Sequence, residues 1–440
     1  MFCFRFLNHV WVLLVLYSCT PSTPSAPSPT PSTPSSTEMQ VLQLPDDQLY
    51  DKVFGALLGS AIGDAMGAPT EMWSRHQMQV EFGHIVGLDS MVREPSAEGI
   101  WDYNLEAGST TDDTRWKALM VDFFTGTGKS VQARQAELDA NDFARLVMNR
   151  YESGIHQLKQ TEAYDSEPFE NQMRKMLWLK EWAMVAKPFV DNDLAAFSDA
   201  LNRFYGGEMV CAGMLFSPMV GVLYPGDPLW AYEQTYAIDI YDLGYAKDIS
   251  GLTASMVAEA MRPGASQDSV LAVMRHVDPK GYFKSRLVGR SAYKLFQDAR
   301  YLVNEAKSIN PTEVLKNPPV QLALPLKTAE DSVRYAQWST AYQKLDQYLM
   351  RFPFHPAEIH LINLTAMMIC AFDFERSLEF VINYGRDNDT VGAVTGAILG
   401  AYHGAKALPQ DQVKQVLEAN QKLGFDLEAM AHRMVEAMGG

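Results

Sequence analysis

Apolar residues recur along most of the chain at intervals of three and four, the spacing of helices that bury one face. Positions 116, 119, 120, 123 and 124 are apolar and follow the polar segment 109–114, which predicts an amphipathic helix with hydroxyl and carboxylate groups at its N-terminus. Similar patterns predict helices within 206–226 and over 250–261, 267–277, 291–307, 356–372 and 374–384, and a pair within 411–438. Because no run alternates as a strand does, the predicted fold class is all-α.

Two apolar segments carry glycine at every fourth position. These glycines are Gly55, Gly59, Gly63 and Gly67 in the first segment, and Gly392, Gly396, Gly400 and Gly404 in the second. Each glycine inside a helix costs about 1 kcal/mol relative to alanine, so a regular stripe of them indicates very close packing. We predict that the two helices pack against each other, with two independent helix contacts as the alternative. Asp389 or Thr390 is the predicted N-cap of the second helix.

Breaks in the pattern suggest loops. Glycine and proline between residues 73 and 108 predict a polar loop without regular structure. The helical region 140–201 is expected to break near Gly154 and Pro188. The proline-rich segment 310–325 is the strongest internal break, and we interpret it as a loop within a single large helical domain over residues 44–440.

The N-terminal region has the composition of an export signal and a linker. Residues 1–18 resemble a signal peptide whose end is similar to a bacterial lipobox, which would make Cys19 the lipidated first residue of the mature protein. An ordinary cleaved signal with an incidental Cys19 is the alternative. Residues 19–43 are rich in Pro, Ser and Thr and predict a disordered tether. The expected location is therefore the cell envelope, with membrane attachment through the lipid anchor only.

The net charge and the cysteine content further limit the functions and features that the sequence allows. The formal net charge of −16 argues against binding of long nucleic acids and suits a cation-binding site. Of the four cysteines, Cys211 and Cys370 lie in apolar segments of the folded region, and we predict two buried free thiols rather than a disulfide.

Three acidic clusters lie next to predicted helix ends. They are Asp64 with Glu71, Asp112 with Asp113, and Asp387 with Asp389. Packing of the two glycine helices would bring the first and third clusters together. Carboxylates gathered in a low-dielectric interior require a cation or protonation, and oxygen ligands suit Mg2+ first, with Mn2+ or Ca2+ as alternatives. Each cluster taken alone is more typical of helix capping, but together they favour a metal site.

The motifs that contain these clusters resemble the ADP-ribosylglycohydrolase family. They are VFGALLGSAIGDAMGAPTE at 53–71, TTDDT at 110–114 and GRDNDTVGAVTGAILGAYHGA at 385–405, in that order. The resemblance implies an all-α fold with a two-metal centre, normally two Mg2+ ions, that hydrolyses the bond at the anomeric carbon of an ADP-ribosyl group. The implied metal ligands are Thr111, Asp112, Asp113, Asp387, Asp389 and Thr390.

The resemblance also suggests roles for residues around the metals. Glu71 or Asp113 would act as the base that activates water. Asp64 belongs to the first motif, and we expect it to be structural or to support the ligands, while keeping it with Arg386 as a candidate substrate-binding residue. Arg386 stands where the family usually has glycine, and it would either hold an anionic group of the substrate or point to solvent.

A second departure from the family pattern leaves the identity of the substrate undetermined. Leu215 replaces an arginine in a segment that helps many members to hold the substrate. The leading expectation is a monomeric enzyme acting on an ADP-ribosyl or related ribosyl compound. One alternative keeps the fold and metals but acts on a nucleoside-like or other small glycoside without pyrophosphate, and another is a metal-stabilised binding module without turnover.

Overall fold

The computed structural model describes residues 44–90, 105–126, 137–160 and 178–439, and the regular structure within these ranges is helical. The first helices are α1 (Asp46–Gly67), α2 (Arg75–Glu81), α3 (Asp112–Gly126), α4 (Ala140–Gln160), α6 (Lys180–Val190) and α7 (Leu194–Leu201). The central ones are α8 (Ala212–Leu223), α9 (Pro228–Ile238), α10 (Ala246–Ala260), α11 (Gln267–His276), α12 (Ser291–Ser308) and α13 (Pro311–Lys316). The last are α14 (Ala329–Leu345), α15 (Pro356–Ile369), α16 (Phe374–Tyr384), α17 (Asn388–His403), α18 (Gln410–Lys422) and α19 (Leu427–Ala437). The predicted all-α fold class is confirmed.

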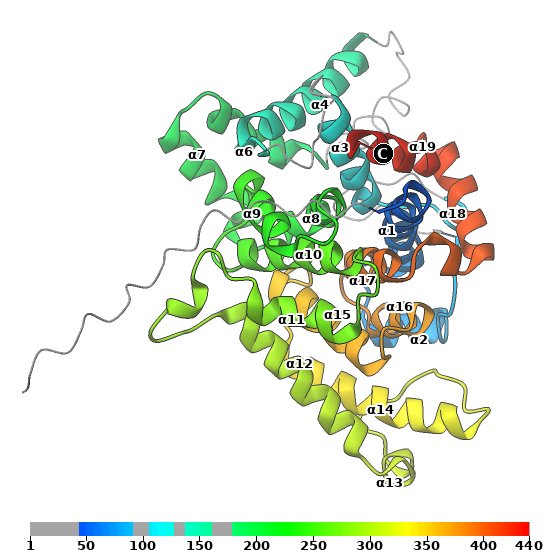
Figure 1. The fold of residues 1–440 in the computed structure, drawn as a ribbon. Helices are drawn as coiled ribbons and strands as arrows, with labels where there is room; N and C mark the ends of the chain where they lie inside the picture. The colour runs from blue at the N-terminus through cyan, green and yellow to red at the C-terminus, as the bar shows by residue number, and fades with distance from the viewer. Residues whose placement is uncertain (1–43, 91–104, 127–136, 161–177, 440) are drawn as a thin grey trace, which may run out of the picture. The chain divides into compact units, whose positions relative to one another are not determined.

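Helices α1 and α17 form the pair that the glycine spacing predicts (Figure 1). They run antiparallel, because a Cβ on Gly55, near the start of α1, would overlap the carbonyl of Gly400, near the end of α17. A Cβ on Gly392 would lie only 2.5 Å from the carbonyl oxygen of Gly63. The two backbones are therefore in direct contact, and the missing side chains are what allows it.

The pair lies inside a shell of other helices. Helix α17 also packs against α8, α10, α15 and α16, and α1 packs against α3, α18 and α19. Both helices are buried over most of their length, Asp64 included, although an ordinary helix of a globular protein buries one face. The C-terminal end of α1 and the N-terminal end of α17 consequently meet in the interior, next to the start of α3.

Several predicted boundaries are confirmed by local chemistry. Asp373 caps α16 by accepting a hydrogen bond from the amide of Arg376, and Gly385 ends that helix with φ of 87°. The predicted cap of α17 is wrong by two residues or more. The helix begins at Asn388, and Asp387 precedes it without a capping side-chain bond. The Asp389 carboxylate takes part in a cluster with those of Asp112 and Asp113 instead of capping the helix.

Most of the other predictions about loops are wrong. The polar loop contains α2, whose cap Ser74 accepts a hydrogen bond from the amide of Gln77. Helix α4 continues through Gly154, since one glycine costs too little to break a packed helix. The expected break near Pro188 is confirmed, since α6 ends at Val190 and α7 begins at Leu194. The proline-rich break contains the short helix α13.

The thiol prediction is confirmed, since Cys211 and Cys370 are buried and free. The proposed signal peptide, Cys19 and the tether lie outside the described residues, so they stay predictions. No helix within the described ranges is long and apolar enough to cross a membrane.

Candidate active site

Asp64 joins the end of α1 to the start of α3. Its carboxylate accepts hydrogen bonds from the amide of Thr111 at 2.9 Å, the amide of Thr114 at 3.0 Å and the hydroxyl of Thr114 at 2.6 Å. Burial, followed by the nearby Asp113 carboxylate, raises the pKa of Asp64 to about 7. Both carboxylate oxygens are thus used to hold the TTDDT segment, which supports a structural role for this residue.

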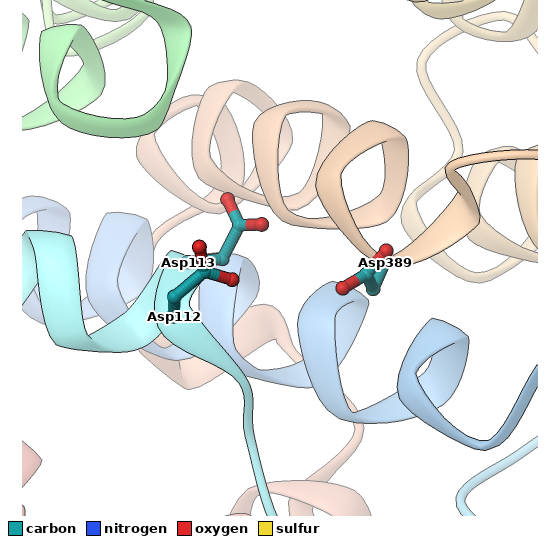
Figure 2. Close-up of side chains that lie close together, drawn as sticks. All are labelled: Asp112, Asp113 and Asp389. Carbon is teal, nitrogen blue, oxygen red and sulfur yellow. The ribbon is translucent and has the colours of Figure 1, made fainter. Parts of the chain in front are cut away.

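The acidic residues of α3 and α17 converge beside this junction. Asp112, Asp113 and Asp389 each offer a carboxylate oxygen, and these atoms lie within 4.8 Å of one another. Figure 2 shows the three side chains, two from the start of α3 and one from the start of α17. The Thr111 hydroxyl donates to Asp389 at 3.2 Å, and the Thr390 hydroxyl donates to Asp113 at 3.0 Å. Residues nearly 280 positions apart therefore share one cluster of oxygen atoms.

One lysine contacts this cluster. Lys117, only 1% exposed, lies 2.9 Å from one oxygen of Asp113. Burial raises the pKa of Asp389 well above its ordinary value, and the carboxylates of Glu71 and Asp387 raise it further. One oxygen of Asp389 is buried without a hydrogen-bond partner. A hard divalent cation bound by these oxygens would give that atom a partner and offset the repulsion that raises this pKa.

The cluster borders a pocket of about 440 Å3. Its acidic side consists of Glu71, Asp112, Asp387 and Asp389, with Thr390 beside them. The rest of the described lining is apolar or aromatic and consists of Met72, Trp182, Tyr205, Val210, Cys211, Ala212, Leu215 and Phe354. The structure therefore brings Glu71 and the six candidate ligands into one region, with Thr111 and Asp113 buried behind the pocket wall.

Arg386 is held by protein groups. Its guanidinium pairs with both oxygens of Glu358, at 2.7 and 2.9 Å, and donates to the carbonyl of Met350 at 2.8 Å. Its backbone exchanges hydrogen bonds with Met72 and Trp73, the residues that follow Glu71. Its φ of 73° is in the left-handed region, which glycine adopts at no steric cost. These contacts favour a bracing role over contact with the substrate, for which Arg386 stays an untested candidate.

Sequence reasoning missed several residues of this region. Lys117 had a signal, because it lies four residues after Asp113 in a predicted helix and i,i+4 pairs of opposite charge face each other. No sequence signal marks the other missed residues, which are Glu358, Tyr205 and Phe354. They reach the site only through the packing of α15 and of the loops before α8 and α15.

Comparison with known proteins agrees with this geometry. The sequence pattern of the family described as ADP-ribosylglycohydrolase matches residues 45–440, nearly the whole chain. The chain belongs to the ADP-ribosylglycohydrolase family. Membership supports a glycohydrolase type of activity, in a family that depends on metal, and the Asp112, Asp113 and Asp389 cluster is suited to bind one.

Individual relatives are distant. The chain is 23% identical over 402 residues to the uncharacterized protein YegU of Escherichia coli strain K12, covering 87% of this chain and 96% of that protein. A solved structure titled ADP-ribosylglycohydrolase-related protein complex aligns with a TM-score of 0.52 and 18% identity. That alignment covers 89% of this chain and 99% of the solved chain, and it establishes the fold.

Proposed function

We propose that the protein is a magnesium-dependent hydrolase that cleaves the glycosidic bond at the anomeric carbon of an ADP-ribosyl or related ribosyl compound. The observation that carries this proposal is the buried, unpartnered oxygen of Asp389, in a cluster with the Asp112 and Asp113 carboxylates beside a pocket. Purely structural carboxylates would be expected to have partners within the chain. Family membership supplies the reaction class.

The cluster has enough oxygen donors for two Mg2+ ions, with Mn2+ as an alternative. When bound, such ions orient sugar hydroxyls and lower the pKa of a coordinated water. The residues proposed to hold them are Thr111, Asp112, Asp113, Asp387, Asp389 and Thr390. Thr111 and Thr390 also donate to Asp389 and Asp113, respectively, so the two motifs fix each other's side chains.

Glu71 is the proposed general base. It is 3% exposed and lines the pocket next to the cluster. Asp113, the other candidate, already binds Lys117 through one oxygen and Thr390 through the other, which supports an orienting role. Departure of the leaving group gives an oxocarbenium-like transition state, which the surrounding carboxylates stabilise electrostatically.

We also propose that the protein acts as an exported, lipid-anchored monomer. This proposal rests on residues 1–19, which resemble a lipoprotein signal. Radiolabelled fatty-acid incorporation in the wild type and its loss in Cys19→Ala would test the anchor.

The proposed reaction is tested by metal-dependent turnover of a substrate panel containing ADP-ribosyl-arginine, ADP-ribosyl-serine and nucleosides. We expect hydrolysis of at least one member to stop after chelation and to return with Mg2+. Asp112→Ala should abolish it, whereas Asp373→Ala, which alters only the exposed cap of α16, serves as the control. Full turnover after chelation, or in Asp112→Ala, would contradict the proposal, and binding without turnover would indicate a non-catalytic module.

A further inference from the structure

The described residues that line the pocket beside the acidic cluster include no lysine, arginine or histidine, the side chains that most often bind phosphate. Arg386 lies next to Asp387 in sequence, but its guanidinium is occupied by Glu358 and Met350. The described lining of the metal-free protein therefore offers an anion no cationic side chain.

Backbone amides at a helix N-terminus are the other common phosphate ligands, and helix α8 begins at the pocket wall. Its first amides are mostly engaged. The amide of Cys211 donates to the carbonyl of Phe354 at 3.0 Å, and that of Gly213 donates to the Asp242 carboxylate at 3.1 Å. The amide of Met214 donates to Cys211 at 2.9 Å. A carboxyl group of the protein thus occupies the place that a phosphate would take.

Acids dominate the part of the lining that the structure describes. Glu71, Asp112, Asp387 and Asp389 line the pocket, and the other described lining residues are mostly apolar or aromatic. A group with two negative charges placed against these side chains would lose its water without gaining a cationic side chain among them, which is costly.

The wall is suited to a flat, uncharged ring. Tyr205 and Phe354 are partly buried side by side at the pocket, with ring centroids 6.0 Å apart. Tyr205 has φ of 44°, a conformation that costs a non-glycine residue about 1–2 kcal/mol. Its amide is held by the Glu181 carboxylate at 3.0 Å. Strain of this kind persists where surrounding structure enforces it and often marks a functional position.

We infer that the substrate of this enzyme is an uncharged ribosyl glycoside with a planar ring, such as a nucleoside, rather than an ADP-ribosyl compound. The inference rests on the proposed function and specifies its substrate class. The acidic cluster would hold the ribose, and the Tyr205 and Phe354 wall would receive the ring. The same wall, together with the engaged amides of α8, would exclude a phosphate.

The direct test compares inosine with inosine 5′-monophosphate, which differ by one phosphate. Calorimetric binding to the full-length Glu71→Gln variant in Mg2+ gives the affinities, and wild-type turnover of both gives kcat/KM. We expect inosine to bind at least about tenfold more tightly, because the phosphate would lose water without gaining a partner. Equal or tighter binding of the monophosphate or of ADP-ribose, or no binding of inosine, would overturn the inference.

Substitutions in the wall give a second readout. Leu215→Arg introduces a cation and should shift the preference towards the monophosphate by about tenfold or more, whereas Leu215→Met should retain the preference for inosine. Val210→Arg is the replacement if circular dichroism shows that Leu215→Arg does not fold. Phe354→Ala should weaken inosine binding more than Phe354→Tyr does. An unchanged preference in a folded arginine variant would count against the inference.

The two proposals can fail separately. Hydrolysis of ADP-ribosyl-arginine in preference to inosine would retain the glycohydrolase reaction and overturn the substrate class. Selective inosine binding without hydrolysis of any glycoside would support the substrate class and overturn the reaction.

Discussion

The molecule buries carboxylates in two contrasting ways. On α10, Asp248 is fully buried and pairs with the equally buried Arg290 at 2.8 and 2.6 Å, while the Tyr232 hydroxyl donates to it at 2.6 Å. At the ends of α1, α3 and α17, the carboxylates of Asp112, Asp113 and Asp389 lie close together, and one oxygen of Asp389 has no hydrogen-bond partner. In the first region both oxygens of the buried carboxylate have partners within the chain, and in the second one oxygen does not.

The difference separates a buried acid whose partners all lie within the chain from one that can accept a ligand. An internally paired carboxylate offsets its desolvation with a fixed cation, so nothing further is required. The unpartnered oxygen of Asp389 is suited to a divalent cation, as proposed above. The following predictions test that contrast.

The largest effect is expected from Asp389→Asn. Loss of a charged ligand should lower kcat by about 1,000-fold or more, corresponding to roughly 4 kcal/mol of transition-state stabilisation. The same change should raise the melting temperature of the metal-free protein, because it removes a buried charge that repels Glu71 and Asp387. Steady-state kinetics and thermal melts in chelator measure both quantities. Unchanged kcat, or a lower melting temperature without metal, would contradict the proposed difference between the Asp389 cluster and the Asp248 pair.

Asp248→Ala should lower the stability of the protein without affecting the metal site, the opposite of what we expect for Asp389→Asn. It leaves the Arg290 guanidinium buried without its partner, which should cost about 3–5 kcal/mol of unfolding free energy. Metal affinity of the folded protein should stay unchanged. Urea denaturation and Mg2+ titration check the two expectations, and a loss of metal affinity at native stability would show that this pair belongs to the site.

Arg386 and Glu358 test whether an ion pair can brace the cluster. If Arg386 acts through Glu358, then Arg386→Ala and Glu358→Gln should each lower kcat/KM about 10–100-fold, with little further loss in the double variant. If Arg386 instead holds the substrate, only its own replacement should raise KM. The KM-against-kcat pattern of the three variants distinguishes these roles.

The contact between α1 and α17 positions the two halves of the cluster. A Cβ in Gly396→Ala would overlap the carbonyl of Gly59, so the helices must separate, at a cost of about 1–3 kcal/mol. Mg2+ affinity should fall as well. Gly126→Ala, where a Cβ meets nothing within 4 Å, is the matched control. Equal stability of the two variants in urea would contradict this account.

His360 shows a third way to bury an ionisable group, as the neutral form. Burial, together with the charge of Arg290, lowers its pKa to about 3, against 6.5 in the unfolded chain. Between these values the unfolded state binds the extra proton, so stability is complete above pH 6.5 and declines as the pH falls towards 3. Relative to His360→Phe, the wild type should lose about 1.4 kcal/mol of unfolding free energy per pH unit, since this difference removes the opposite contribution of Asp64, which both proteins share. Urea unfolding from pH 7 to 4.5 measures it, with the exposed His76→Gln as control.

Much of the site could be predicted because its requirements are local. Glycine at every fourth position indicates that a backbone must approach closely, and the structure confirms that contact between α1 and α17. Once these two helices pack together, the acidic residues at their ends are brought close to one another. Helix α14 was missed although Thr328 and Asp331 form a capping box, a signal that was present in the sequence.

The sequence by itself determined the helical class, the glycine stripes and the acidic triplets, since each depends on residue type and short spacing. Only the tertiary structure decided whether Arg386 is available to a ligand and which side chains line the pocket. It pairs Arg386 with Glu358 and places Tyr205 and Phe354 in the pocket lining. Charge balance and pocket lining are sums over side chains from distant parts of the chain, so they exist only once those parts have packed together.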